Sequence, residues 1–106
     1  DRRIQPGRVK IEMPQIAENG NVVPITIDVE SPMVADDYVK GIHLFSEQNP
    51  LPDIVEFELG PHNGKARVST RIRLAKSQHV LAVATLNDDR LWFAQALIEV
   101  TVSGCG

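Results

Sequence analysis

Apolar residues alternate with polar residues at every second position over most of this chain, and no long stretch repeats them at every third or fourth position. Successive side chains of a β-strand point to opposite faces, so a period of two predicts strands with one buried face. The pattern is clearest in Val23, Ile25, Ile27 and Val29, which would share one face of a single strand. The sequence therefore predicts an all-β fold.

Turn-forming residues divide the alternating pattern into about seven expected strands, which is the number and spacing typical of an immunoglobulin-like, antiparallel β-sandwich. The expected strands cover residues 9–13, 23–29, 38–45, 54–59, 66–74, 79–86 and 91–102. Pro24 interrupts the second of them, so we expect that strand to begin at a sheet edge or at a bulge, where a missing backbone N–H is tolerated.

Two hairpins are expected between neighbouring strands. The first would join 54–59 to 66–74 through Asn63-Gly64, because an Asn-Gly pair between two alternating segments is a strong hairpin signal. The second would join 79–86 to 91–102 around residues 87–90. Asp88-Asp89 in that turn, and Asp36-Asp37 in an earlier one, are interpreted as turn-forming and solubilising residues rather than as paired catalytic acids.

The length of 106 residues fits one domain, and 42% hydrophobic with 24% charged residues is a composition typical of a folded chain. One cysteine cannot form a disulfide between the two sheets, so packing has to hold the core. We therefore expect one immunoglobulin-like domain over residues 1–102, followed by a flexible C-terminal arm over residues 103–106.

Charge and hydropathy argue against nucleic acid and membrane as partners. The 11 basic and 14 acidic residues are interspersed and only 5% of residues are aromatic, whereas nucleic-acid binders usually show a basic stripe with stacking aromatics. The longest apolar run, 91–102, is interrupted by Gln95 and Glu99 and is too short to span a bilayer. A soluble protein is expected.

Neither metal binding nor independent catalysis is expected. His43, His62 and His79 lack the close spacing of a zinc site, and no second cysteine is present to complete one. Ser69 lacks the Gly-x-Ser-x-Gly context of a hydrolase nucleophile. The sequence thus predicts no cofactor and no enzyme activity of its own.

The last expected strand carries apolar residues on both faces. Its inward set is Trp92, Ala94, Ala96, Ile98, Val100 and Val102. Leu91, Phe93 and Leu97 fall on the other face, among polar residues. Because apolar sheet surfaces are usually covered, these three predict a contact with a second subunit.

Cys105 is the residue most suited to carry chemistry. It follows Ser103 and Gly104 and precedes Gly106, and glycine on both sides leaves the backbone free to take many conformations. The three residues from Val102 to Cys105 span roughly 10 Å when extended, so the thiol can leave the body of the domain. A reactive group that has to enter several pockets would need such an arm.

Other interpretations of Cys105 stay open at this point. It could lie in an idle, frayed terminus of an immunoglobulin-like binding or adhesion module, or form an intermolecular disulfide. A thiol enzyme such as a peroxidase would need a cationic or histidine neighbour to lower the pKa of the cysteine. The adjacent C-terminal carboxylate is instead expected to keep that pKa at or above its ordinary range, so that a partner would have to activate the thiol.

Several motifs together point to a known family. They are Pro-Gln-Ile-Ala-Glu-Asn-Gly (14–20), Val-Pro-Ile (23–25), Ser-Pro-Met (31–33), Asn-Pro (49–50), Ser-Thr-Arg-Ile-Arg-Leu-Ala (69–75) and Gly-Cys-Gly (104–106). From residue 11 to residue 106 the chain resembles the SoxY family, the sulfur-carrying subunits of the bacterial Sox system for thiosulfate oxidation. That family ends in a Gly-Gly-Cys-Gly-Gly arm, from which this chain departs by having Ser103 at the first glycine and one glycine fewer at the end.

The resemblance implies a function, partners and a location. Cys105 would hold thiosulfate-derived sulfur covalently, in a heterodimer with the companion subunit SoxZ. A haem c-type ligating enzyme, a sulfate-releasing hydrolase and a sulfane dehydrogenase would act on the cargo in turn. The carrier would be periplasmic, and since the chain has neither an initial Met nor a signal peptide, we expect a processed or trimmed form.

Overall fold

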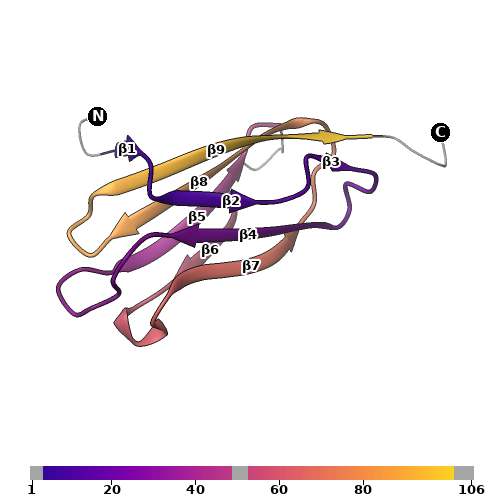
Figure 1. The fold of residues 1–106 in the computed structure, drawn as a ribbon. Coiled ribbons are helices and arrows are strands. Elements are labelled where there is room, and N and C mark those ends of the chain that lie inside the picture. Colours follow the sequence, from indigo (N-terminus) through magenta and orange to yellow (C-terminus); the bar gives the residue numbers. More distant parts are fainter. Residues whose placement is uncertain (1–3, 49–52, 102–106) are drawn as a thin grey trace.

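The computed structural model describes residues 4–48 and 53–101, which form two packed layers of β-strands (Figure 1). The strands are β1 (Ile4–Pro6), β2 (Val9–Glu12), β3 (Ile16–Ala17), β4 (Val23–Val29), β5 (Val39–Ser46), β6 (Asp53–Glu58), β7 (Ala66–Ile72), β8 (Gln78–Leu86) and β9 (Leu91–Val100). A single turn of 3-10 helix, η1 (Pro61–Asn63), lies between β6 and β7. Within these ranges no helix has the length and apolar character needed to cross a membrane.

The strands divide into a larger and a smaller sheet. The larger sheet has the order β1-β9-β8-β5-β6, with β3 paired to the far end of β9, and the smaller sheet has the order β2-β4-β7. The predicted all-β, immunoglobulin-like sandwich is confirmed. The described residues contain nine strands rather than about seven, because β1 and β3 are only three and two residues long, too short for alternation to reveal them.

The core lies between the two sheets and follows the alternation in the sequence. Val23, Ile25, Ile27 and Val29 of β4 are each at most 3% exposed. They face equally buried residues of the larger sheet, among them Ile42, Leu44, Val80, Ala82, Ala84 and Ile98. Since burying one such aliphatic side chain contributes about 1.5–3 kcal/mol, this set accounts for a stable domain without a disulfide.

The segment between β6 and β7 is not the predicted hairpin. β6 pairs with β5 in the larger sheet, whereas β7 pairs with β4 in the smaller one. Asn63 ends η1, its side-chain oxygen accepts a hydrogen bond from the backbone N–H of Gly60 at 2.8 Å, and Gly64 follows with φ of 76°. The Asn-Gly pair therefore carries the chain from one sheet to the other. Glycine with positive φ suits both a hairpin and a helix end, so the local signal cannot distinguish them.

The second predicted hairpin is confirmed. β8 and β9 pair antiparallel from Gln78 opposite Ile98 to Thr85 opposite Leu91. In the turn the carboxylate of Asp88 accepts hydrogen bonds from the backbone N–H of Arg90 at 3.1 Å and from its Nε at 2.8 Å. Asp88 thus forms the turn, as expected.

Pro24 lies where β4 has only one neighbour. β2 pairs with the stretch of β4 from Thr26 to Val29, whereas β7 pairs with the whole strand and places Arg71 opposite Pro24. One side of β4 is therefore open at Pro24, and the absence of a proline N–H breaks no ladder there. The expected edge position is confirmed.

Candidate functional site

The predicted attachment residue, Cys105, and the predicted arm residues Ser103, Gly104 and Gly106 lie outside the described residues. Their roles stay predictions. The structure describes the chain up to Thr101, which directly follows β9 at one end of the sandwich (Figure 1). We call the end of β9 and the residues that hold it the arm base.

One side of the arm base is held by β3. This short strand runs parallel to β9 and places Ile16 opposite Glu99. The backbone N–H of Glu99 donates to the carbonyl of Gln15, and the N–H of Thr101 donates to the carbonyl of Ala17, each at 2.9 Å. The chain is thus tied to the sandwich through Thr101.

The other side of the arm base is held by Ser77, and Gly20 lies close to Val100 of β9. The hydroxyl oxygen of Ser77 accepts a hydrogen bond from the backbone N–H of Val100 at 2.8 Å. The carbonyl of Gly20 accepts one from Leu74 N–H at 2.7 Å, and a Cβ on Gly20 would lie 2.1 Å from the Leu74 oxygen and 3.0 Å from Val100 Cγ1. Only glycine fits this close approach without a shift of the backbone.

The sequence reasoning missed both supports of the arm base. β3 is two residues long, so alternation over so short a stretch carries no signal. Ser77 stands in an ordinary polar segment, and its bond to Val100 joins residues 23 positions apart. The close approach of Gly20 to Leu74 and Val100 depends on the tertiary fold, so no local pattern reveals it.

Exposed apolar side chains occur close to the arm base. Ile16 on β3 is 56% exposed, Val22 just before β4 is 51% exposed, and Leu97 on β9 is 58% exposed. Ile16 is paired with Glu99 near the end of β9, and Leu97 lies on β9 itself. Val22 lies two residues after Gly20. Large apolar side chains in contact with water often mark a surface that another protein covers.

The outer face of the larger sheet is apolar across its middle strands. Register places Phe45 of β5 beside Leu81 of β8, and Val83 of β8 beside Phe93 of β9. The expected apolar set on β9 is therefore part of a wider apolar surface. Its contact with a second subunit stays a prediction. A hollow of about 310 Å³ opens there, lined by Phe45, Ser46, Glu47, His79, Leu81 and Gln95.

Two histidines on this face each pair with a glutamate. His43 Nε2 lies 3.2 Å from Glu56 Oε2, and His79 Nδ1 lies 3.0 Å from Glu47 Oε1. Glu47 Oε1 also accepts a hydrogen bond from the backbone N–H of His79 at 2.8 Å. This backbone bond, followed by the bond to the imidazole, lowers the pKa of the Glu47 carboxyl below its usual value.

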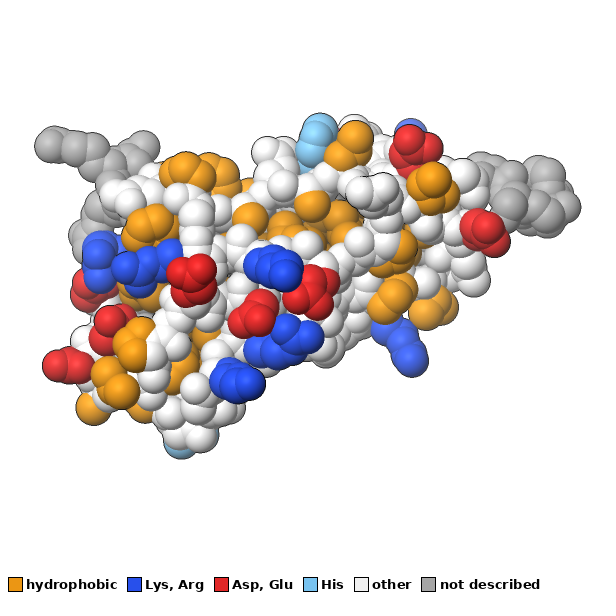
Figure 2. All heavy atoms as spheres, in the orientation of Figure 1, with side chains coloured by type: hydrophobic (Ala, Val, Ile, Leu, Met, Phe, Trp, Pro, Cys, Tyr) orange, Lys and Arg blue, Asp and Glu red, His pale blue; other side chains and the backbone are white. Residues whose placement is uncertain are grey.

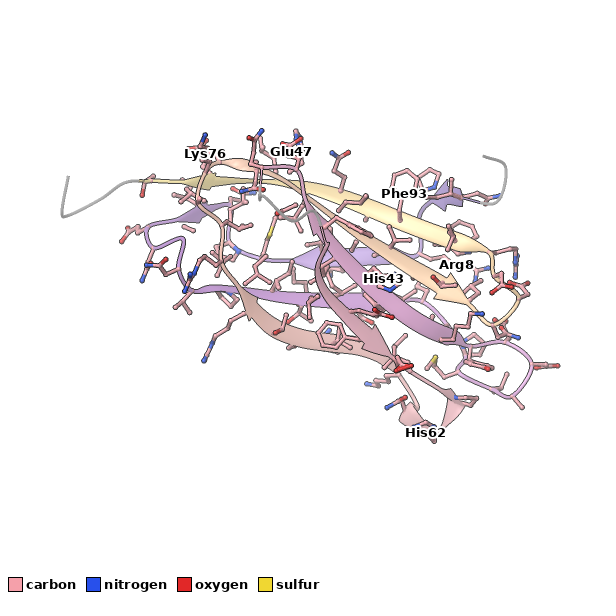
Figure 3. All side chains as sticks on the ribbon, turned by 180° about the vertical axis from the view of Figure 1, so that it is seen from behind. Arg8, His43, Glu47, His62, Lys76 and Phe93 are labelled. Atoms are coloured by element: carbon pink, nitrogen blue, oxygen red, sulfur yellow. The ribbon has the colours of Figure 1, made fainter. Side chains whose placement is uncertain are left out.

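The three histidines are not brought together. His62 lies in η1, far from His43 on β5 and from Glu47, the partner of His79 (Figure 3). Across the described ranges no three His, Cys, Asp or Glu side chains are grouped closely enough to hold a metal ion.

The outer face of the smaller sheet has a different character. Ser69 lies on it, with its hydroxyl 2.8 Å from that of Thr26 on the neighbouring strand. Arg67 contacts Asp28 at 3.0 Å and Glu12 at 3.5 Å. Figure 2 shows such blue and red side chains intermixed over β2, β4 and β7, a pattern of paired charges facing water.

Structural comparison finds similar folds in a sulfur carrier protein and in superoxide reductases, among others. The sulfur carrier protein SoxY of Chlorobium limicola f thiosulfatophilum is 31% identical, with a TM-score of 0.77 over 93% of this chain and 84% of that chain. The superoxide reductase (neelaredoxin) of Ignicoccus hospitalis is 23% identical, with a TM-score of 0.78 over 90% and 81% of the two chains. The superoxide reductase of Nanoarchaeum equitans is 17% identical, with a TM-score of 0.71 over 85% and 90%. At such identities the two reductases indicate a shared fold alone.

Sequence comparison is more specific. Among curated proteins no sequence matches this chain. The family model described as "Sulfur oxidation protein SoxY" matches residues 1–105, which is nearly the whole chain. Together with the Chlorobium carrier, this match shows that the chain belongs to the SoxY family of sulfur-oxidation proteins.

Proposed function

We propose that this chain carries thiosulfate-derived sulfur covalently on Cys105 during sulfur oxidation, and that it is a carrier subunit rather than an enzyme. The observation that most supports the proposal is the arm base. Hydrogen bonds from β3 and Ser77 fix the chain through Thr101, and a Ser-Gly-Cys-Gly sequence begins two residues later. A fixed base followed by glycines around a thiol suits a group that visits several active sites.

The chemistry requires other proteins. Joining a cysteine thiol to the outer sulfur of thiosulfate forms an S–S bond, releases the thiol proton and removes two electrons. A redox partner has to accept those electrons, and a haem c-type ligating enzyme is the class that the family resemblance supplies. A sulfate-releasing hydrolase and a sulfane dehydrogenase would then act on the bound species, so the carrier itself needs no cofactor.

The proposal includes a companion subunit and a compartment. We propose that the chain forms a heterodimer with SoxZ and works in the periplasm, where it would meet the enzymes that act on its cargo. The apolar outer face around Phe45, Leu81 and Phe93 supports a stable partner, because such a surface is costly to leave in water. The exposed Ile16 and Val22 near the arm base would be available to the enzymes that bind transiently.

The test is a loading assay read by mass. The full chain, its companion subunit and the haem enzyme are incubated with thiosulfate, and intact mass and peptide mapping locate any added sulfur. We expect the addition on the peptide that contains Cys105 and none in Cys105→Ser, which should fold and bind its companion normally. Turnover of thiosulfate by the Cys105→Ser complex at the normal rate would rule out the carrier function.

A further inference from the structure

The smaller sheet has a hollow at the end where β4 begins and β7 ends. Its volume is about 590 Å³, and three residues of each strand line it, namely Pro24, Ile25, Thr26, Ser69, Thr70 and Arg71. Antiparallel register places Thr26 opposite Ser69 and Pro24 opposite Arg71. One lining residue carries a positive charge and none carries a negative charge, so the lining has a net positive charge.

Arg71 differs from Arg67, the other arginine of β7, in having no counter-ion across the strands. Arg67 lies opposite Asp28 and contacts its carboxylate at 3.0 Å. Arg71 lies opposite Pro24 instead, and among the described residues no carboxylate forms an ion pair with it. Its side chain is exposed. The planar guanidinium, with its five N–H donors, is therefore available to an anion.

Two hydroxyls beside Arg71 supply a further donor. Thr26 Oγ1 and Ser69 Oγ lie 2.8 Å apart, and either can donate to the other. Whichever hydroxyl donates, the accepting one keeps a hydrogen that this bond does not use. Ser69 and Arg71 are two residues apart on one strand, so their side chains leave the same face of the sheet. The free O–H and the guanidinium thus lie on one side of the sheet.

The carboxylate that register places beside the hydroxyl pair is already engaged. Glu12 of β2 lies opposite Thr26, and it contacts Arg67 at 3.5 Å and Lys10 at 3.8 Å. These two cations offset its charge. Arg73, which is exposed just after β7, adds positive charge at this end of the sheet. An anion in the hollow would therefore meet more positive than negative charge.

We propose that this hollow binds a small tetrahedral oxoanion such as sulfate or thiosulfate. The guanidinium of Arg71 would donate to two oxygens of the ion, and the free O–H of the hydroxyl pair to a third. Both ions carry at least three oxygens around one sulfur atom, so the same donors suit either. Because Arg71 and Ser69 are exposed, binding would be weak and reversible. The site includes no atom of Cys105, so it does not depend on the carrier function.

The first experiment is a titration of the full chain followed by ¹H–¹⁵N NMR spectra. Sodium sulfate or sodium thiosulfate is added, and sodium chloride at the same ionic strength is the reference. We expect saturable shifts of the amides of Thr26, Ser69, Thr70 and Arg71 with a dissociation constant on the order of 1–10 mM. Chloride should cause no saturable shift, because it cannot accept from the three donors at once.

The second experiment repeats the titration with variants. Arg71→Gln is compared with Lys65→Gln, which removes the same charge from an exposed residue just before the opposite end of β7. Arg71→Gln is expected to weaken oxoanion binding by about fivefold or more, and Lys65→Gln by less than about twofold. The double variant Thr26→Val, Ser69→Ala keeps the arginine and should weaken binding by about threefold. Circular dichroism checks that each variant is folded.

Three results would overturn the inference. They are no saturable shift with either oxoanion, equal weakening by Arg71→Gln and Lys65→Gln, and an unchanged affinity in the hydroxyl double variant. The second of them would mean that anions respond to net charge alone. Cys105→Ser is expected to bind sulfate as the unchanged chain does. A chain that binds sulfate but takes up no sulfur on Cys105 would refute the proposed function and leave this site intact.

Discussion

Gly20 lies where the surrounding backbone leaves no room for a side chain. Its carbonyl accepts the Leu74 N–H at 2.7 Å, and the space that a Cβ would need is occupied by the carbonyl of Leu74 and by Val100. The glycine therefore sets how closely the loop before β4 approaches the end of β9. Side-chain bulk at this position acts directly on the arm base.

Gly20→Ala is expected to destabilise the protein by about 1–3 kcal/mol, because the new Cβ overlaps backbone that has to move. Urea unfolding followed by circular dichroism measures the change in the free energy of unfolding. Gly41→Ala is the control, since a Cβ there would lie 3.6 Å from the Phe57 carbonyl, an ordinary contact. Equal stability of the two variants would contradict this expectation, because it would mean that the backbone around Gly20 moves at little cost in free energy.

Glu47 makes stability depend on pH in the acid range. Its hydrogen bonds to His79 lower the pKa of the folded carboxyl below the reference value of 4.5. The stabilisation is therefore present above pH 4.5 and is lost as pH falls through the lower, folded pKa. Glu47→Gln cannot ionise, so it should lose less thermal stability than the unchanged protein on acidification below pH 4.5. Melting temperatures measured across that range test this, and parallel curves would contradict it.

Among the strands, β9 has the most neighbours and leads toward the C-terminus. It pairs with β8 along its length, with β1 at its beginning and with β3 at its end. The end that leads to the arm is thus bonded on both sides, by β3 and by Ser77, rather than left as a fraying terminus. Under the proposed carrier function, this bonded end of β9 would be the fixed base from which Cys105 reaches the enzymes.

Ser77→Ala is expected to loosen the end of β9 while leaving the rest of the fold unchanged. It removes the acceptor for Val100 N–H, a hydrogen bond of the kind that contributes about 0.5–1.5 kcal/mol. Amide hydrogen exchange should therefore speed up at Val100 and Thr101 and stay unchanged at the centre of β8. The control is Ser31→Ala, which removes a similar bond to Met33 elsewhere in the fold. Unchanged exchange at Val100 would mean that β3 alone holds the end.

The longer strands could be predicted from the sequence because local alternation reports burial directly. The segment 23–29 of β4 was predicted to the residue, and β7 and β9 ended two residues earlier than expected. The connection through Asn63-Gly64 could not be predicted, because glycine at positive φ serves a crossover as well as a hairpin. The parallel pairings of β1 and β3 with β9 join opposite ends of the chain, so no turn signal announces them.

At the scale of the whole molecule, the two outer faces differ in character. The face of the smaller sheet carries charges paired with one another, such as Arg67 with Asp28 (Figure 2). The face of the larger sheet carries an apolar centre, where Phe45 lies beside Leu81 and Val83 lies beside Phe93. A sandwich with one solvated face and one apolar face is suited to bind another protein through the apolar face.

Part of the candidate site can be proposed from the local sequence alone. Cys105 stands out in the sequence because a thiol between glycines has no packing role. The arm base depends on contacts between distant segments, such as Val100 with Ser77 and Thr101 with Ala17. Only three-dimensional structure brings those residues together.

The most direct test of the central claim is the intact mass of the full chain after reaction with thiosulfate, its companion subunit and the haem enzyme, followed by peptide mapping. The carrier function predicts a mass increase by a bound sulfur species that maps to Cys105, disappears on reduction and is absent from Cys105→Ser. Thiosulfate oxidation at a normal rate with no sulfur bound to Cys105 at any stage would contradict it.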